Sequence, residues 1–425
     1  MTKNNKSARI IIHRGTEEIG GSITEIAMGN TIVWVDAGSE LPGNSGKVTD
    51  ADMIRLASER PVDAILFTHY HGDHVGLMDK LPKEIPIYMD RDMKELLTVL
   101  HKYTKNAVMQ EILGNMKGRI HTFTPGEDFT IGDIKIIPFF VDHSAYHANM
   151  LLFECAGQTI LHSGDFRSSG YLGKSVDKIP DILRNLHKKV DVLISEGTML
   201  TRDAKGENLL TEWDLRRKVE IFLKGHQQVF VICSSTNFDS LTSICHAAKK
   251  NNLPIYANDY MREMLAKFEE LAGKYAAVYR LPQIHDIDDI NRNHPHEFIL
   301  LLGSMLGKSM GDAAKLYDNY RKLTGTQNPW LIYSMWRGYL DTAQAAYNAP
   351  LAKFVGNFGE QVLFSHSSGH ADRDTLAKFI TDISPQKYIL PLHTENAAGF
   401  KELDIEDKYK DIVTLLCDGY KLEID

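Results

Sequence analysis

Several features are missing from this sequence, and each absence excludes a class of protein. The longest apolar runs, such as Phe298–Leu302, are too short to cross a membrane. The N-terminus, MTKNNKSARIIIHRG, lacks the apolar stretch of a signal peptide. No repeat or low-complexity tract interrupts the chain. We therefore expect a globular protein that is retained in the cytoplasm and has no membrane partner.

Cysteine is scarce and scattered. Only Cys155, Cys233, Cys245 and Cys417 occur, and no two of them form a CxxC pair. Scattered cysteines in a cytoplasmic protein are usually reduced. We expect four buried free thiols rather than disulfides or metal ligands.

Positive charge is also in short supply. The chain has 48 lysines and arginines against 56 aspartates and glutamates, so its net charge is −8. Such a total argues against a protein that coats nucleic acid electrostatically. It does not exclude a nuclease, because bound metal ions and a local basic channel can attract phosphates.

The length of 425 residues exceeds the usual size of one hydrophobic core, which indicates two domains or one domain inserted into another. Short apolar runs alternate with amphipathic segments of helical length, the pattern of an α/β protein. The first 170 residues are rich in strands, and a separate parallel-sheet unit begins near residue 205. The expected strands are Ile10–Ile12, Thr31–Val35, Ala64–Thr68, Lys135–Phe140, Met150–Phe153, Thr159–Leu161, Val229–Cys233, Pro254–Ala257, Phe298–Leu302, Trp330–Tyr333, Gln361–Phe364 and Lys387–Pro391. The expected helices are Thr211–Leu223, with Thr211 as N-cap and Asp214 in the capping-box position, Asp239–Lys250, Asp372–Ile383 and Glu395–Leu403.

The strongest chemical signal is the run His69-Tyr70-His71-Gly72-Asp73-His74, which directly follows the expected strand Ala64–Thr68. By composition, three histidines and an aspartate at these offsets should arise on the order of once in a thousand such chains. Imidazole nitrogen and carboxylate oxygen suit zinc, so His69 and His71 can bind one ion while Asp73 and His74 bind a second. The alternative is a loop of four polar surface residues.

Four more candidates follow apolar strands: Asp36, His143, Asp165 and His393. Each one alone would more often be a turn or cap residue. Their common position at strand ends favours a shared site.

This order of residues resembles the metallo-β-lactamase superfamily. The resemblance implies an αββα sandwich with two metal ions, zinc or alternatively manganese, at one sheet edge. In it, one ion is held by His69, His71 and His143, and the other by Asp73, His74 and His393. Asp165 bridges both ions, and Asp36 orients a ligand from behind.

Further motifs resemble the β-CASP branch of that superfamily, whose members process RNA or, less often, DNA. The extra length lies between Asp165 and His393, and the matching motifs contain Glu196 (Leu-Ile-Ser-Glu-Gly-Thr), His370 (Ser-His-Ser-Ser-Gly-His-Ala) and His393 (Leu-His-Thr-Glu). The match to RNase J-like sequences covers nearly the whole chain. It departs from them where the chain stops without their extra C-terminal domain, and where an expected arginine is missing shortly after Asn237.

The resemblance implies a sandwich formed by residues 1–205 and 352–425, interrupted by a β-CASP-like insert at 206–351. The substrate is expected in the cleft between the two lobes, and single-stranded RNA is favoured. Cleavage of DNA, the mode of cleavage and an oligomeric assembly are left open.

The residue types fit phosphodiester hydrolysis. Two metal ions about 3.5–4 Å apart can supply hydroxide and neutralise the non-bridging oxygens. The leaving oxygen needs a proton, and His370, oriented by Glu196, is the expected general acid. The alternative for His370 is a simple cap at a strand end.

Phosphate contacts are expected from two runs that precede helices, although capping explains them equally well. These residues are Ser234, Ser235, Asn237, Ser367, Ser368 and Gly369. Two other functions stay open: a hydrolase of small esters or thioesters, which needs the metals but not Glu196 or His370, and an inactive scaffold subunit of an RNA-processing complex. Inactive subunits usually lose metal ligands, and this sequence lacks none.

Overall fold

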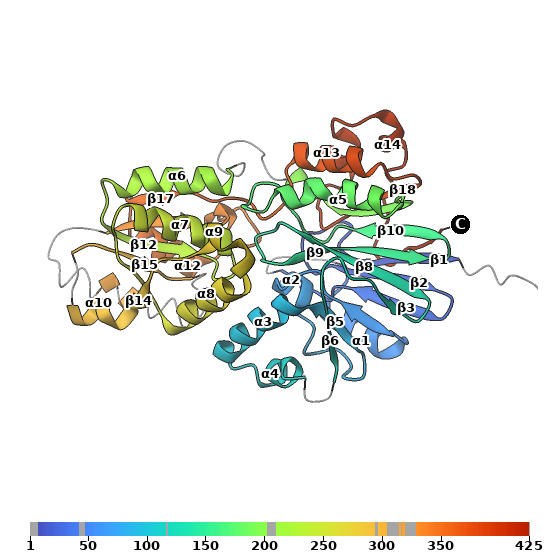
Figure 1. Ribbon diagram of the computed structural model, residues 1–425, viewed down its shortest axis with the longest axis horizontal. Coiled ribbons are helices and arrows are strands. Elements are labelled where there is room, and N and C mark those ends of the chain that lie inside the picture. The colour runs from blue at the N-terminus through green and yellow to red at the C-terminus, as the bar shows by residue number, and fades with distance from the viewer. Residues whose placement is uncertain are drawn as a thin grey trace, which may run out of the picture. The chain divides into compact units, whose positions relative to one another are not determined.

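The computed structural model describes residues 7–41, 47–115, 118–201, 210–293, 296–303, 314–315, 317–318 and 329–424. The chain forms two compact units (Figure 1). The first unit contains Met1–Ser168, Leu172–Ala204 and Gly369–Asp425, and the second contains Ser169–Tyr171 and Lys205–Ser368.

The first unit is built on two sheets. The seven-stranded sheet has the order β19-β1-β2-β3-β4-β5-β6, and the six-stranded sheet has the order β18-β11-β10-β9-β8-β7. The strands of the former are β1 (Ala8–Arg14), β2 (Ile23–Met28), β3 (Thr31–Val35), β4 (Ala64–Leu66), β5 (Ile87–Asp90), β6 (Ile120–Phe123) and β19 (Lys421–Ile424). Those of the latter are β7 (Phe129–Ile131), β8 (Ile134–Val141), β9 (Ala148–Cys155), β10 (Gln158–His162), β11 (Val192–Glu196) and β18 (Tyr388–Leu392).

The two sheets pack face to face around one apolar core, because alternate residues of each strand point to opposite faces. Ile10 and Val33 of the seven-stranded sheet meet Ile136 and Leu151 of the six-stranded sheet in this core. Ile137, the neighbour of Ile136, instead faces a separate core beneath helices. This arrangement confirms the expected αββα sandwich.

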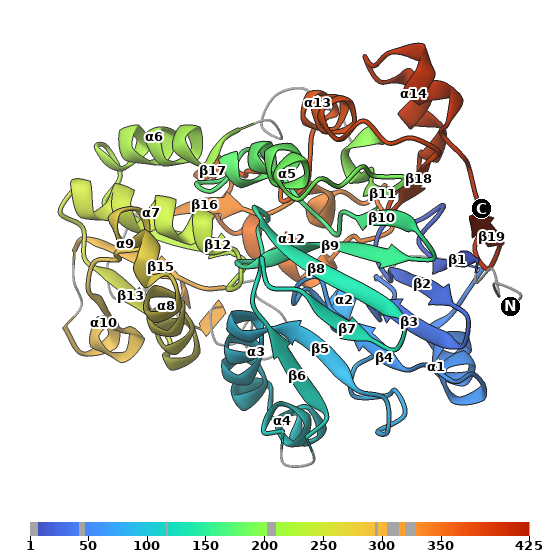
Figure 2. The ribbon, with the colours of Figure 1, turned by 45° about the vertical axis from the view of Figure 1, so that its right-hand side comes forward.

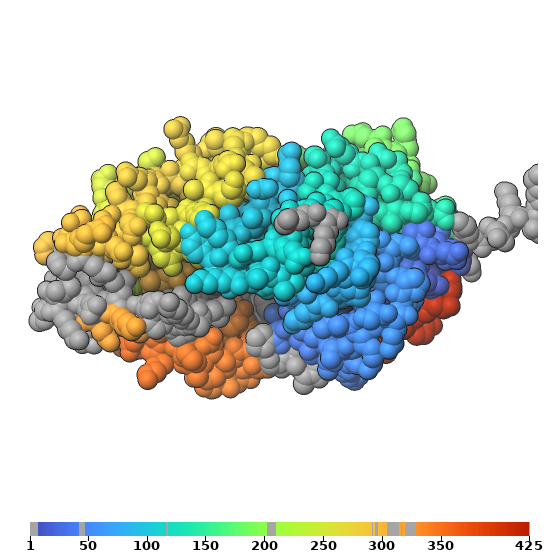
Figure 3. Space-filling model, turned by 90° about the horizontal axis from the view of Figure 1, so that it is seen from below, coloured from blue at the N-terminus to red at the C-terminus, as the bar shows by residue number. Residues whose placement is uncertain are grey.

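Helices lie on the outer faces of the sandwich (Figure 2). The six-stranded sheet is covered by α5 (Lys174–Asn185) and α13 (Arg373–Ile383), which share its outer core. The other helices of this unit are α1 (Asp50–Glu59), α2 (Gly72–Val75), α3 (Arg91–Thr104), α4 (Ala107–Leu113) and α14 (Asp407–Asp411), with the 3-10 helices η1 (Thr198–Leu200) and η5 (Ala397–Glu402). The space-filling view shows the blue and cyan N-terminal half of this unit as one continuous surface (Figure 3).

The second unit is a six-stranded sheet in which every strand pairs in parallel, in the order β14-β13-β15-β12-β16-β17. Its strands are β12 (Gln228–Cys233), β13 (Ile255–Ala257), β14 (Ile284–Asp286), β15 (Phe298–Leu301), β16 (Trp330–Ser334) and β17 (Val362–Phe364). Its described helices are α6 (Glu212–Leu223), α7 (Phe238–Lys250), α8 (Asp259–Leu271), α9 (Ala276–Tyr279), α10 (Ile287–Asn293) and α12 (Ala349–Gly356), with the 3-10 helices η3 (Gly273–Tyr275) and η4 (Arg337–Leu340). Thr211 and Asp214 form the expected capping box of α6.

Three expectations differ from the structure. The chain returns to the first unit at Gly369 rather than at residue 352, because α12 packs into the core of the second unit and β17 pairs with β16. Glu395–Leu403 is not an α-helix: a 3-10 helix over Ala397–Glu402 begins at Asn396, whose side chain accepts a hydrogen bond from the backbone of Gly399. All four cysteines are free, but Cys417 is exposed because it lies in the turn before β19.

No helix within the described ranges has both the length and the apolar character that crossing a bilayer requires.

Candidate metal centre

Strand direction gathers the predicted metal ligands at one edge of the sandwich. β3 and β4 are parallel, and Asp36 and His69 follow their carboxyl ends. β10, β11 and β18 are parallel as well, and Asp165 and His393 follow β10 and β18. β8 runs in the same direction as β10 because both are antiparallel to β9, so His143 reaches this edge too.

Three histidines form the first cluster. The rings of His69 and His71 lie 4.9 Å apart between centroids, and those of His69 and His143 lie 4.6 Å apart. Nε2 of His143 is 3.1 Å from Nδ1 of His71. These three residues could hold one metal ion together.

Asp73, His74 and His393 form the second cluster. Nε2 of His393 is 3.2 Å from Oδ2 of Asp73. Oδ2 of Asp165 lies 3.1 Å from Nε2 of His74 and 3.8 Å from Nε2 of both His69 and His393. The carboxylate of Asp165 therefore contacts members of both clusters, as a bridging ligand would.

The ring nitrogens that face away from the clusters have hydrogen-bond partners, and these partners orient the rings. For His74 the partner is Oδ2 of Asp36 at 2.8 Å, and for His143 it is the carbonyl oxygen of Gly369 at 2.5 Å. The hydroxyl of Thr198 lies 2.8 Å from Nδ1 of His393. Sequence reasoning found Asp36 but missed Thr198, although Thr198 stands two residues after Glu196 in the same motif.

The inward-facing nitrogens fit a metal ion. Nε2 of His69 is buried and has no hydrogen-bond partner. A buried polar atom without a partner costs about 1–3 kcal/mol. Coordination to a divalent cation removes this cost, and a set of imidazole nitrogens and carboxylate oxygens is suited to zinc and manganese.

Burial controls which ligands are neutral. Burial lowers the pKa of His71 to about 4 and also depresses the pKa values of His69 and His143, so these rings offer a lone pair at neutral pH. Burial also opposes the charged forms of His74 and His393, but the neighbouring carboxylates, chiefly Asp165, outweigh it and raise both pKa values. Without a cation, these two rings carry protons that a metal ion would displace.

Asp73 behaves in the opposite way. Burial favours its neutral form, yet the hydrogen bond from His393 and the charge of His74 lower its pKa below the usual range. Its side chain is therefore a carboxylate at neutral pH, the form that binds metal.

The turn after β3 positions the loop His69–His74, which contains the HxHxDH motif. Asp36 has a φ of +61° and accepts hydrogen bonds from the backbone and the hydroxyl of Thr68. A Cβ atom at Gly38 would lie 1.7 Å from the carbonyl oxygen of Asp73, closer than atoms can approach. Only glycine allows this contact, so Gly38 sets the position of the Asp73 backbone.

Glu196 and His370 form a pair beside the metal clusters. Oε2 of Glu196 lies 3.1 Å from Nδ1 of His370, and the glutamate also accepts hydrogen bonds from the backbone of Phe166, Thr198 and Ala371. Nδ1 of His370 is 3.7 Å from Oδ2 of Asp165. The side chain of His370 is 16% exposed, whereas that of Glu196 is 1% exposed. The imidazole is thus held by a buried carboxylate and reaches solvent next to the metal ligands.

Most of the residues predicted to bind phosphate lie in the second unit, namely Ser234, Ser235, Asn237, Ser367 and Ser368, and Gly369 lies in the first. Several have structural partners. Asn237 caps α7 by accepting from the backbone of Ser240, and the hydroxyl of Ser235 lies 2.9 Å from that of Tyr260. Gly369 orients His143 through its carbonyl oxygen. Phosphate binding by this set remains a prediction.

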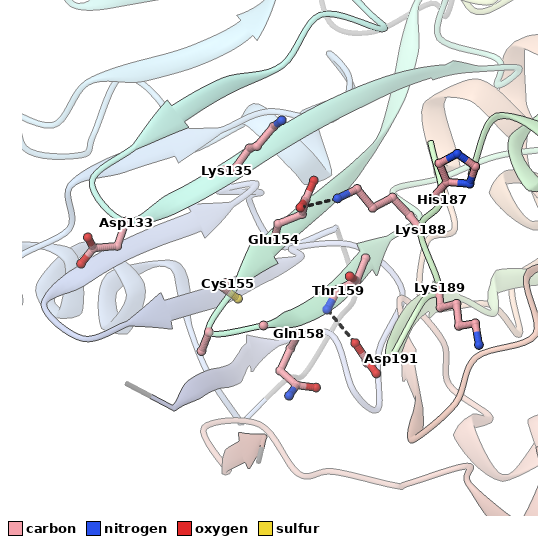
Figure 4. A pocket seen from close by; sticks show the side chains of 12 residues that line it. Asp133, Lys135, Glu154, Cys155, Gln158, Thr159, His187, Lys188, Lys189 and Asp191 are labelled. Carbon is pink, nitrogen blue, oxygen red and sulfur yellow. Dashed lines mark hydrogen bonds and ion pairs between the residues drawn. The ribbon is translucent and has the colours of Figure 1, made fainter. Parts of the chain in front are cut away.

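A pocket of about 650 Å³ lies at the other end of the six-stranded sheet (Figure 4). It is lined by residues that begin β8 and β10 or end β9, among them Lys135 and Glu154, and by residues between α5 and β11, among them Lys188. Lys188 forms an ion pair with Glu154 at 2.7 Å. The metal ligands belong to the opposite strand ends, so this pocket is separate from the metal centre.

Comparison with known proteins gives two family matches. Residues 31–222 match the beta-lactamase superfamily domain, and residues 362–415 match the Zn-dependent metallo-hydrolase RNA specificity domain. Both matches include residues of the site described above.

Curated relatives are similar over nearly the whole chain. Ribonuclease J of Mycoplasma genitalium is 23% identical to this chain, and the alignment covers 94% of this chain and 72% of that relative. Ribonuclease J of Mycobacterium tuberculosis is 25% identical to this chain, and the alignment covers 91% of this chain and 68% of that relative. Ribonuclease J of Helicobacter pylori is 22% identical over 93% of this chain, which spans 57% of that relative.

A solved structure supports the fold. The crystal structure of a protein of unknown function from Enterococcus faecalis has a TM-score of 0.73 and 17% sequence identity to this chain. The similarity covers 98% of this chain and all of the other.

Proposed function

This chain belongs to the metallo-β-lactamase superfamily, and from that premise we propose that it is a zinc-dependent ribonuclease that acts on single-stranded RNA. The match to an RNA specificity domain and the relatives named Ribonuclease J support RNA as the substrate. Five of the seven predicted ligand side chains are buried, which favours a narrow single strand over a duplex; these are His69, His74, His143, Asp165 and His393. The two units would correspond to a metallo-β-lactamase domain and a β-CASP-like insert.

The observation that carries the proposal is the Glu196–His370 pair. A hydrolase of small esters or thioesters needs the metal ligands but no such pair. Nδ1 of His370 faces the buried carboxylate of Glu196, which orients the ring. Its place 3.7 Å from Asp165 puts a proton donor beside the metal ligands.

We assign the proposed roles of the residues from their positions. One ion would be held by His69, His71 and His143 and the other by Asp73, His74 and His393, with Asp165 between them. When bound, the metal ions would supply hydroxide at neutral pH and positive charge for the non-bridging phosphate oxygens. Asp36 and Thr198 keep two ligand rings in place, and His370 donates a proton to the leaving 3′ oxygen.

End-labelled single-stranded RNA tests the proposal. The metal-loaded protein is incubated with strands that carry a 5′-monophosphate, 5′-hydroxyl or 5′-triphosphate, and the products are sized. We expect shortened RNA from at least one substrate, and the product sizes distinguish internal from end-directed cleavage. Matched arms with single-stranded DNA and with a thioester are run beside it.

The matched variants are Asp73→Asn, which removes a ligand charge, and Asp407→Asn, which makes the same change at a residue whose side chain is 96% exposed. Cleavage should disappear in the former and persist in the latter. If all RNA substrates stay intact while the thioester is hydrolysed, the ribonuclease proposal fails and the small-ester hydrolase takes its place.

A further inference from the structure

A second group of metal-binding side chains lies outside the metal centre, in the first unit. It consists of Asp90, Asp92 and His147. Asp90 ends β5, Asp92 lies in the first turn of α3, and His147 directly precedes β9. The three residues are 1%, 9% and 7% exposed, so two distant segments of the chain bring two carboxylates and an imidazole together in a buried place.

One side of the imidazole is already engaged. Nδ1 of His147 lies 3.2 Å from Oδ1 of Asp90. The same oxygen caps α3 by accepting from the backbone of Asp92 and Met93. An acceptor in this position requires that Nδ1 of His147 carries the ring proton when the imidazole is neutral.

The other side of the imidazole is not satisfied. Nε2 of His147 is buried and has no hydrogen-bond partner. It lies 3.5 Å from Oδ2 of Asp92. In the neutral ring this nitrogen presents a lone pair to a carboxylate oxygen, so two acceptors face each other, which is unfavourable in a buried place.

A cation and a second proton on the ring are the two ways to resolve this conflict, and the distance favours the cation. A charge-assisted N–H···O bond is typically about 2.7–2.9 Å long, well below 3.5 Å. By contrast, two ligand atoms that each lie about 2.1 Å from one ion and are 3.5 Å apart subtend roughly 110°, close to the tetrahedral angle. The N-terminus of α3 carries a partial positive charge of about half a unit, which repels a cation. The negative charges of Asp90 and Asp92 together are larger, so the net field still attracts a cation.

We propose that His147 and Asp92 bind a third divalent metal ion of the zinc or manganese class, while Asp90 orients the imidazole through Nδ1. An imidazole nitrogen beside a carboxylate suits these ions better than calcium or magnesium, which prefer oxygen ligands alone. The side chains of His147 and Asp92 keep 8% and 12% of their surface exposed, which leaves an ion a way in.

The third ion would stabilise the loop that carries His143 without taking part in hydrolysis. Tyr146 donates its backbone N–H to the hydroxyl of Tyr70 at 2.7 Å, and Tyr70 stands between the ligands His69 and His71. His143, also a predicted ligand, lies four residues before His147. An ion that links β5 and α3 to this loop would hold the loop, and with it His143. The φ of His147 is +60°, a strained value that such a link helps to maintain.

The experiment counts bound ions. Protein stripped with a chelator is titrated with Mn²⁺, and binding is followed by the loss of the electron paramagnetic resonance signal of free Mn²⁺. Native mass spectrometry of the metal-loaded protein gives an independent count. The variants are Asp92→Asn, His147→Asn, whose new side chain tolerates the left-handed backbone, and Glu95→Gln, which changes one charge on the same helix without altering any of the three residues.

We expect Asp92→Asn and His147→Asn each to bind about one ion fewer than the wild type, while Glu95→Gln matches the wild type. Because each count is a difference from the wild type, the result does not depend on how many ions the main centre holds. An equal count in the wild type and in folded Asp92→Asn overturns the proposal. If both variants fail to fold, the mass of the metal-loaded wild type decides. The two main clusters are proposed to hold one ion each, so a mass with a third ion supports the site. A mass with no third ion overturns it.

Discussion

Replacing Glu196 with glutamine tests the assigned roles of both members of the Glu196–His370 pair. The carboxylate is 1% exposed and accepts four hydrogen bonds. Oε1 accepts from the backbone of Phe166 and Ala371, both at 3.2 Å. Oε2 accepts from the backbone of Thr198 at 3.2 Å and from His370 at 3.1 Å. Glutamine keeps the volume but turns one acceptor into a donor.

The structure decides where the amide nitrogen goes. In the Oε1 position it would face two backbone N–H groups, and the two lost hydrogen bonds would cost about 2–6 kcal/mol at roughly 1–3 kcal/mol each. In the Oε2 position only the N–H of Thr198 loses its acceptor, because His370 can move its proton to Nε2 and accept at Nδ1. We therefore expect the second placement and a loss of about 1–3 kcal/mol in the free energy of unfolding.

The placement of the amide nitrogen in the Oε2 position also determines how much RNA cleavage the Glu196→Gln variant loses. His370 keeps a proton at Nε2, but its protonated form loses a charge-assisted hydrogen bond worth about 1.5–3 kcal/mol. At 1.36 kcal/mol per tenfold, RNA cleavage should slow by about 10- to 100-fold. Removing the general acid entirely in His370→Ala should cost more, about 10²- to 10⁴-fold.

The assay compares three measurements for the wild type and both variants: metal content, urea unfolding, and the rates with RNA and with a p-nitrophenyl phosphodiester. The p-nitrophenolate leaving group needs no proton, so its rate should be largely spared, and metal content should stay constant. Equal losses on both substrates would show that leaving-group protonation is not the role of the pair. Loss of an ion in His370→Ala would make this residue a ligand, and Asp165, Glu196, His370 and His393 do lie close enough to share one ion.

Three further predictions concern the metal centre. Asp73→Asn should fold like the wild type but lose about one ion and all RNA cleavage, and a variant with normal metal content and turnover would contradict the ligand assignment. Gly38→Ala should displace the backbone of Asp73, since its Cβ atom would lie 1.7 Å from that carbonyl oxygen, so metal affinity should fall; affinity equal to that of the wild type would show that the contact is relieved elsewhere. Metal binding should release protons from His74 and His393, whose raised pKa values favour their protonated forms, whereas the lowered pKa values of His69, His71 and His143 favour neutral rings. Affinity should therefore increase with pH until the raised pKa values are passed, and calorimetry in buffers of different ionisation enthalpy should find release below those values but little above them.

Much of the fold could be predicted because its signals are local. β8 shows this: Ile136 and Ile137 point to different cores, and the alternation of apolar residues was enough to predict a strand. The capping box at Thr211 and Asp214 was equally local. The return point at residue 369 was not predictable in the same way, because the pairing of β17 with β16 depends on partners far away in the sequence.

For the site, the sequence by itself determined the identity of the candidate ligands, since the HxHxDH spacing and the polar residues after apolar strands are visible without coordinates. The tertiary structure alone decided how those ligands are held. Thr198 faces His393, the carbonyl of Gly369 faces His143, and the backbone of Asp73 rests on Gly38. Threonine and glycine occur throughout any chain, and a carbonyl group leaves no trace in the sequence, so no pattern marks these contacts. The Asp90, Asp92 and His147 group emerged for the same reason: its members are ordinary cap and loop residues until β5, α3 and the start of β9 bring them within reach of one ion.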